Sequence, residues 1–299
     1  AIASRNLAVA RRAADRLGIP KAYGSYDELL QDPSIEAIYN PLPNSLHAQW
    51  TIAAAEADKH VLCEKPLAVS VAEGRRMVAA CRSHGVVLME AFMYRHHPQH
   101  GVAWSLLRRD AVGELRHIRA SFTFRHTSPR GNIRFMPELA GGALMDVGCY
   151  TINLARFAAG AEPVAVHAVQ RVSEEFGVDV GVSMILEFPN GLAATLDAGF
   201  DRAGGGRYEL VAEGGTVTVS NAFTPAAYPV PVTLQLADRS ETMQVGSSYQ
   251  YALELDHFAS SVFAGALQSP AEDGLANTAV VEAARRAMRE GQRVLVERV

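Results

Sequence analysis

The segment HVLCEKP, residues 60–66, decides the fold class. Its first four residues form a short apolar run that predicts a buried strand, and Lys65 follows closely on the end of that strand. Ligands of open parallel sheets bind beyond the carboxyl ends of the strands. Pro66 fixes its own φ angle and favours an extended Lys65, so the ammonium group would project from a defined backbone. A solvated Glu-Lys pair in a surface turn has the same local sequence, and it is the rest of the chain that favours a site.

Helical patterns and short apolar runs alternate on both sides of this segment. Asn6 is a suitable N-cap for a helix that Gly18 would end, and Ser25 with Glu28 forms a capping box. The expected strands are residues 1–3, 35–39, 61–63 and 86–89, and the expected helices are residues 7–17, 45–57, 71–84 and a short one starting at Ser25. Such alternation implies right-handed βαβ units and a parallel sheet. We therefore expect a doubly wound α/β domain of the Rossmann type over residues 1–94.

The pattern changes after Tyr94, where strands begin to follow one another directly. The expected strands are residues 118–124, 164–172, 180–188, 192–200, 208–212 and 216–219, and the expected helices are residues 98–109, 141–159, 251–264 and 275–290. A run of strands without intervening helices indicates a largely antiparallel sheet. We expect residues 95–299 to form an α+β domain with a large, mostly antiparallel and open-faced sheet.

Composition excludes several classes of protein. The 299 residues are 48% hydrophobic and 20% charged, as in an ordinary soluble globular protein. A net charge of −4 gives no electrostatic case for nucleic acid or an anionic membrane, and no apolar run approaches the roughly 20 residues that span a bilayer. The three cysteines are too few and too scattered for a metal site or a disulfide framework. We expect a cytoplasmic protein that binds neither nucleic acid nor membrane.

The segment NPLPN, residues 40–44, follows the strand expected to end at Tyr39. Its two prolines would hold the loop rigid and extended, which suits Pro41, Leu42 and Asn44 to contact a flat cofactor ring. The alternative is an ordinary connection that contains prolines. His47, in the first turn of the next helix, is either part of this cofactor site or a capped surface histidine.

A second strong signal is the segment GGALMDVGCY, residues 141–150. On a helix, Asp146 and Tyr150 are four residues apart and share a face, with Asn153 one turn further on. The carboxylate could bind a substrate hydroxyl while the phenol exchanges a proton. A free phenol has a pKa near 10, and we expect the Lys65 ammonium to lower the pKa of Tyr150. The alternative is that Asp146 caps a neighbouring group and Tyr150 packs in the core.

Arg95 follows the strand expected over residues 86–89. It either binds cofactor or substrate, or pairs with a carboxylate at the domain junction. The neighbouring His96, His97 and His100 lack a supporting acid or thiol pattern and only partly share a helix face. We expect no metal site there.

Ser4 and Arg5 lie at the end of the first expected strand. In dinucleotide folds this position commonly holds an acid that binds the ribose 2′-hydroxyl, whereas an arginine suits a 2′-phosphate. The first fourteen residues contain no Asp or Glu, and Arg11 and Arg12 add to the positive charge. The sequence therefore favours NADP over NAD, with NAD as the alternative cofactor.

Taken together, residues 40–44, Glu64-Lys65-Pro66, Tyr94-Arg95 and residues 142–150 resemble the glucose–fructose oxidoreductase/inositol dehydrogenase (Gfo/Idh/MocA) family. The resemblance extends from Ala1 to the final helix. Within the family the chain is most similar to NADP-dependent xylose dehydrogenases, dihydrodiol dehydrogenases and glucose–fructose oxidoreductase. Inositol dehydrogenase-like members carry histidine where this chain has Tyr150, which favours an aldose or a vicinal diol over a cyclitol.

The resemblance implies a dehydrogenase that transfers a hydride between a sugar or diol carbon and nicotinamide. Lys65 would orient the substrate hydroxyl, Tyr150 would be the acid/base, and Asp146 would hold the sugar. The residues implied on the nicotinamide side are Pro41, Asn44, Glu64 and Arg95. Specificity would come from the second domain's sheet and from residues 122–135, and the open sheet face would mediate a homodimer or homotetramer. The alternatives are a non-catalytic cofactor or sugar sensor on the same fold, and an inactive fragment.

One departure from the family pattern concerns the start of the chain. Family members open with a strand, a Gly-x-Gly-x-x-Gly turn and a helix that bind the pyrophosphate. The sequence contains none of these three elements. We expect a βα unit of roughly thirty residues to precede Ala1 in the natural protein. The chain as given would then bind NADP weakly and expose the edges of a split sheet.

Overall fold

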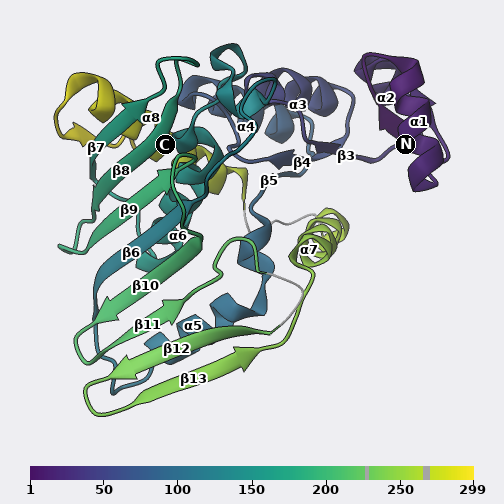
Figure 1. The fold of residues 1–299 in the computed structure, drawn as a ribbon. Helices are drawn as coiled ribbons and strands as arrows, with labels where there is room; N and C mark the ends of the chain where they lie inside the picture. Colours follow the sequence, from purple (N-terminus) through teal and green to yellow (C-terminus); the bar gives the residue numbers. More distant parts are fainter. Residues whose placement is uncertain (226–228, 265–269) are drawn as a thin grey trace.

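The computed structural model describes residues 1–225, 229–264 and 270–299. Its first third holds parallel strands, as expected for a doubly wound domain, but they form two separate sheets (Figure 1). Strand β1 (Ile2–Ala3) pairs with β2 (Ala22–Tyr23), and β3 (Ala37–Asn40), β4 (His60–Glu64) and β5 (Leu88–Ala91) form a second sheet. Among the described strands, none joins the first sheet to the second. The expected split sheet is confirmed.

The helices of this half begin and end where the capping residues predict. Helix α1 (Leu7–Leu17) starts at Asn6, whose side chain accepts from the backbone N–H of Ala8, and ends at Gly18 with a φ of 68°. The side chain of Ser25 caps α2 (Tyr26–Leu30) by accepting from the N–H of Glu28. Helices α3 (His47–Glu56) and α4 (Val71–Ser83) complete this half.

The second half is built on one nine-stranded sheet, in the order β13-β12-β11-β10-β6-β9-β8-β7-β14. Its expected strands are β6 (Leu115–Thr123), β7 (Ala165–Val172), β8 (Asp179–Glu187), β9 (Ala193–Gly199), β10 (Gly206–Ala212) and β11 (Gly215–Val219). Seven of the eight neighbouring pairs are antiparallel, and β6 with β9 at the centre is parallel. The mostly antiparallel sheet is therefore confirmed.

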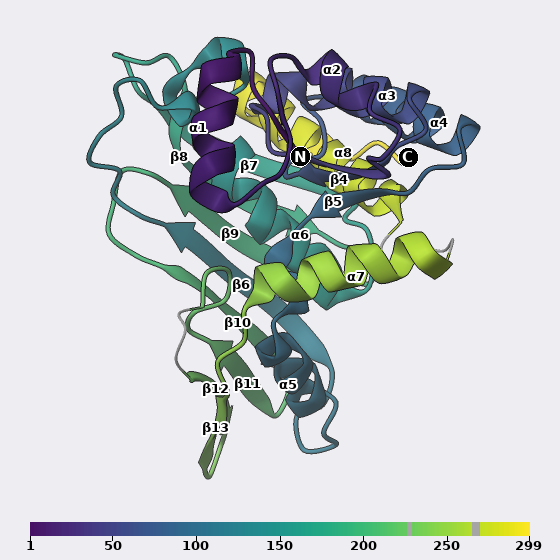
Figure 2. The ribbon, with the colours of Figure 1, turned by 90° about the vertical axis from the view of Figure 1, so that its right-hand side faces the viewer.

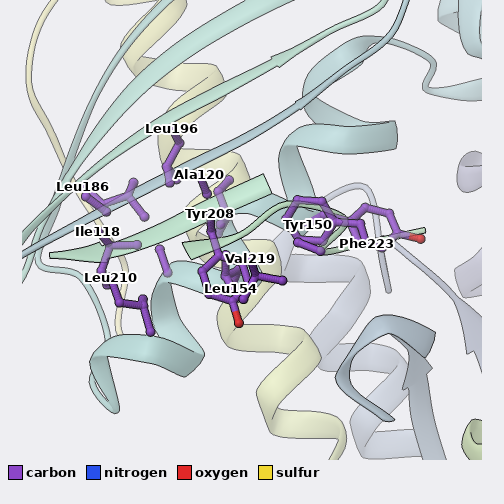
Figure 3. Close-up of a cluster of buried hydrophobic side chains, with 14 of the residues drawn as sticks. Ile118, Ala120, Tyr150, Leu154, Leu186, Leu196, Tyr208, Leu210, Val219 and Phe223 are labelled. Carbon is purple, nitrogen blue, oxygen red and sulfur yellow. The ribbon is translucent and has the colours of Figure 1, made fainter. Parts of the chain in front are cut away.

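Helices cover one face of this sheet and leave the other face open. Helices α5 (Pro98–Leu107), α6 (Cys149–Ala159) and α8 (Ala271–Glu290) share one apolar core with the sheet. Figure 2 shows α5 and α6 on the same side of the sheet, and Figure 3 shows part of the core, with Ile118, Leu154, Leu196 and Tyr208. On the open face, Val169 is 69% exposed.

The C-terminal helices return to the first half of the chain. Helix α7 (Gln250–Ala264) places Phe258 against Leu62 and Met89 of the parallel sheet. Helix α8 packs Ala271, Leu275 and Ala279 against the core around α4. Both helices therefore help to fix the position of the two halves relative to each other. No helix within the described residues is long and apolar enough to cross a membrane.

The structure differs from the expected elements in a few places. Strands β2, β12 (Val230–Leu236), β13 (Ser240–Val245) and β14 (Val294–Leu295) were not expected. The expected helix over residues 141–159 is divided into a π-helical turn, Leu144–Gly148, and α6. The sequence pattern could not reveal this division, because the widened turn is held by groups distant in the chain, as described below.

Candidate active site

A pocket of about 400 Å³ lies between the two halves, where the loops after β3 and β4 face the helical segment 144–159. Most of the residues expected at a site contribute to its lining: Pro41, Leu42, Asn44, His47, Glu64, Lys65, Asp146 and Tyr150. The first six come from the parallel-sheet half and the last two from the other half. The carboxyl ends of two parallel strands are thus brought against one helical segment.

Lys65 crosses from the first half to the second. Its Nζ donates to Asp146 Oδ1 at 3.0 Å and to the Asp146 backbone carbonyl at 2.9 Å. Asp146 belongs to the π-helical turn, whose wider backbone leaves this carbonyl accessible to a side chain. The same Nζ lies 5.0 Å from the centre of the Tyr150 ring, within the range of a cation–π contact. Lys65, Asp146 and Tyr150 therefore meet.

The Lys65–Asp146 pair stays charged although both side chains are largely buried, with relative exposures of 13% and 14%. Burial alone would lower the pKa of Lys65, but the nearby Asp146, Cys149 and Glu64 together outweigh it and the net pKa is raised. Burial would likewise raise the pKa of Asp146, but Lys65 and Arg134 together lower it. The pocket thus contains a permanent ammonium group.

Tyr150 contradicts one expectation from the sequence. Burial raises its pKa well above the ordinary value, and the acidic neighbours Glu64 and Asp146 add to the rise. The expected lowering by Lys65 is wrong because burial, which disfavours the charged phenolate, is the largest influence on this pKa. The ring is surrounded by Phe92, Phe122 and Phe223, with Phe223 beside it in Figure 3.

The phenol group of Tyr150 nevertheless belongs to the pocket lining. Its hydroxyl donates a weak hydrogen bond to Met93 Sδ at 3.3 Å. Thioether sulfur is a poor acceptor, so a substrate oxygen would compete for this proton at little cost. The arrangement holds a protonated phenol ready to donate.

Arg134 is a site residue that motif reasoning missed. It lies in the 3₁₀ turn Ile133–Phe135, lines the pocket, and donates from Nε to Asp146 Oδ2 at 2.7 Å. Both carboxylate oxygens of Asp146 therefore have cationic partners. Its only signal in the sequence is a place within residues 122–135, the segment expected to govern specificity.

His47 and Asn44 connect the loops that form the pocket. His47 Nδ1 lies 2.8 Å from the carbonyl oxygen of Pro66, and Nε2 lies 2.7 Å from that of Leu42. The side chain is buried, so the surface-histidine alternative is wrong. Asn44 Nδ2 donates to the carbonyl of Ala140 at 2.8 Å and thereby ties the first half to the second.

The helical segment is held at its start by a carboxylate from the sheet. Asp179, in β8, accepts a hydrogen bond from the N–H of Leu144 at 2.6 Å. Gly142 has a φ of 113°, and a Cβ there would collide with the Asp179 carboxylate. Helix N-termini favour negative charge, so Asp179 fixes the segment that carries Asp146 and Tyr150.

Three expected cofactor residues lie outside the pocket lining. Ser4 and Arg5 follow the carboxyl end of β1, in the separate two-stranded sheet. Arg95 pairs with Asp273 at 2.6 Å and donates from Nε to Asn153 Oδ1. These contacts match the alternative of an ion pair at the junction of the halves.

The histidines near Arg95 are used in packing. His100 Nδ1 lies 3.0 Å from the Tyr208 hydroxyl, and His97 caps α5 by accepting from the N–H of Gln99. His96 lies against His257, with ring centres 5.0 Å apart. Among the described residues, no group of three or more His, Cys, Asp or Glu could hold a metal ion.

Comparison with known proteins identifies the family. Residues 1–92 match the model of the GFO/IDH/MocA oxidoreductase family, NAD-binding Rossmann fold, and residues 102–218 match its C-terminal domain model. The chain belongs to the Gfo/Idh/MocA family. It is 40% identical to D-xylose 1-dehydrogenase (NADP(+)) 2 of Haloferax volcanii, over 89% of this chain and 81% of the relative.

Two further relatives are similar to most of this chain. Trans-1,2-dihydrobenzene-1,2-diol dehydrogenase of Xenopus laevis is 32% identical, over 90% of this chain and 82% of the relative. The crystal structure of a 3-ketoreductase from Actinomadura kijaniata, in complex with NADP and TDP-benzene, superposes with a TM-score of 0.91. That protein is 35% identical, and the match covers 96% of this chain and 88% of that one.

Proposed function

We propose that this protein is an NADP-dependent oxidoreductase that transfers a hydride between nicotinamide and a carbon bearing a hydroxyl group in an aldose or a vicinal diol. One observation carries the proposal: Lys65 from the first half reaches Asp146 and the Tyr150 ring in the second half. Xylose and dihydrodiol dehydrogenases among the relatives support the substrate class, and the NADP complex of the ketoreductase supports the cofactor.

The donor set of the pocket fits a nicotinamide ring. Pro41 and Leu42 give apolar surface to the lining, and Asn44 and Glu64 give polar groups beside it. Ser4 and Arg5 would bind the ribose phosphate end, since a dinucleotide extends over several strand ends in this fold. The chemistry that bound NADP supplies is hydride transfer at the nicotinamide.

The chain's own residues handle the proton. Lys65 would donate a hydrogen bond to the reacting oxygen of the substrate while Asp146 holds the ammonium in place. Tyr150 would exchange the proton with the same oxygen. Because Tyr150 is held protonated, it is ready to act as an acid in carbonyl reduction, whereas oxidation first requires the phenolate. We therefore expect the oxidation rate to rise with pH.

The test is NADPH formation by the protein with a panel of aldoses and trans-diols, followed by absorbance. Turnover of at least one aldose or diol is expected, with the rate increasing towards alkaline pH. Tight NADP binding without turnover of any panel member would favour a sensor instead. If the protein neither binds NADP nor turns over any panel member, that result would count against the family's chemistry in this chain.

We also propose how the protein is organised and where it acts. Residues 1–94 would form the cofactor domain and residues 95–299 the substrate domain. The exposed sheet face, with Val169 and Ile185 among its apolar side chains, would form the interface of a homodimer or homotetramer. Three buried, free cysteines support a reducing, cytoplasmic location.

A further inference from the structure

The charges that line the pocket balance. Two cations, Lys65 and Arg134, face two carboxylates, Glu64 and Asp146. Asp146 is bound to both cations at once, and Glu64 accepts from the Tyr39 hydroxyl at 2.6 Å. Neither cation therefore offers an unopposed charge to an incoming ligand.

Arg134 uses only part of its hydrogen-bonding capacity in this network. Its Nε donates to Asp146, whereas no hydrogen bond from Nη1 or Nη2 is present among the described residues. The side chain is 40% exposed and lines the pocket. A guanidinium group has five N–H donors in a planar fork. Four of them thus remain for water or for a ligand.

Apolar side chains share the pocket lining with Arg134. Ile133, Phe122 and Phe124 line the same pocket, and Phe122 lies edge-on to Tyr150 with ring centres 5.4 Å apart. Sugars and polyols present hydroxyl groups on their edges and C–H groups on their faces. A pocket lined by both a polar fork and aromatic rings matches both kinds of surface.

We propose that Arg134 is a specificity-determining residue whose two terminal nitrogens bind oxygen atoms of an uncharged polyol, and that the balanced pocket discriminates against sugar acids and sugar phosphates. This inference rests on the proposed function and names its substrate class. An anionic group would find Arg134 already paired with Asp146 and would lie in the same pocket as the Glu64 carboxylate. A buried charge without its own partner is costly.

Binding of two matched ligands tests the proposal. Xylitol and D-xylonate have the same carbon chain, but only xylonate carries a charge. We expect wild-type protein with bound NADP to bind xylitol about tenfold or more tightly than xylonate in calorimetric titrations. Equal affinities, or a preference for xylonate, would overturn the charge argument.

Variants separate Arg134 from its neighbours. Arg134→Met should weaken xylitol binding about tenfold or more, and Arg134→Lys should recover only part of it because lysine lacks the fork. Asp146→Asn should shift the ratio of affinities towards xylonate. The matched control is Arg239→Gln, an exposed arginine in the turn between β12 and β13 that pairs with Glu241, and it should change neither affinity. Unchanged xylitol affinity in Arg134→Met would refute the role of Arg134.

These measurements can refute the role of Arg134 and the proposed function separately. Xylitol binding that depends on Arg134, without turnover of any sugar, would leave the subsite in place and overturn the dehydrogenase activity. If aldoses are turned over and Arg134→Met changes neither KM nor kcat, the dehydrogenase activity would stand and the role of Arg134 would be refuted.

Discussion

The two halves of the molecule build their share of the pocket in different ways. The parallel-sheet half contributes side chains from loops directly after β3 and β4, so that Asn44 and Lys65 are placed by the strand ends that precede them. The other half contributes Asp146 and Tyr150 from a helical segment, and that segment is held by Asp179 of a strand more than thirty residues later. Local sequence is enough to place the first group, whereas the second depends on contacts distant in the chain.

The largest expected effect comes from removing the contact between the halves. Tyr150→Phe should reduce turnover by a factor of about 10² to 10⁴, the usual contribution of a proton-transfer group. Lys65→Ala, which removes a hydrogen-bond donor to the reacting oxygen, should reduce it by about 10² to 10³. Steady-state kinetics with the best aldose of the panel measures both. Lys21→Ala, which removes a surface lysine paired with Asp32, is the control and should leave turnover unchanged. Near wild-type rates in both site variants would show that the contact between the two halves is not needed for turnover.

Asp179 offers a way to test the long-range part of the comparison. Asp179→Ala should lower kcat about tenfold and change KM little. The reason is that the N–H of Leu144 loses its acceptor, so the segment with Tyr150 loosens. A lost hydrogen bond to a charged group costs roughly 1.5–3 kcal/mol. Asp179→Asn keeps an acceptor and should restore most of the rate. If alanine and asparagine behave alike, Asp179 does not position the segment.

His47 tests the loop-borne part. His47→Phe should lower the free energy of unfolding by about 1–3 kcal/mol, since the imidazole N–H that a carbonyl of Pro66 or Leu42 accepts is lost. Denaturant titration measures this loss. The control is His84→Phe, at an exposed histidine beside Asp58; a loss of stability as large there would mean that the effect is not specific to the loops.

The smallest expected effect is a pH dependence of stability at the junction of the halves. Burial and the nearby Glu64 raise the pKa of Glu254, in α7, to about 8 from an ordinary 4.5. The folded protein therefore keeps a proton that the unfolded chain has lost, and this contribution to stability disappears as the pH rises through 8. Glu254→Gln should make the decrease in Tm between pH 6 and 9 smaller by about 2 °C or more. An identical decrease in the variant would show that Glu254 is not the group responsible.

A buried histidine gives the opposite dependence on the acid side and serves as the comparison. Burial lowers the pKa of His100 to about 3 from 6.5, so the unfolded chain takes up a proton that the folded protein refuses. Stability is then lost as the pH falls below about 6.5. Glu254→Gln should leave this acid limb unchanged below about pH 4.5, where Glu254 is protonated in both the folded and the unfolded chain.

The sequence predicted the strand and helix order well where signals are local. Caps at Asn6 and Ser25 and the stop at Gly18 are decided by a few neighbouring residues, and the structure confirms them. Strands β12 and β13 went unrecognised because their pairing with each other and with β11 stabilises them. Propensity is a weak guide where pairing decides.

The site shows the same division between local and distant information. The motif residues Lys65, Asp146 and Tyr150 were predicted from the sequence, and the structure places all three in one pocket. The predicted direction of the Tyr150 pKa shift was wrong, because burial and the closeness of Glu64 cannot be read from spacing along a helix. Arg134 was missed for a similar reason: its partner lies in another element, and no motif marks it.

The amino-acid sequence by itself determined the class of each half, the motif that follows β4, and the residue types available for proton transfer. These depend on periodicity, capping and proline geometry, which act over a few residues. Only the tertiary structure decided which groups meet, which charges cancel and which protons stay bound. Those properties depend on distance and burial, and both are set by how the helices and sheets pack together.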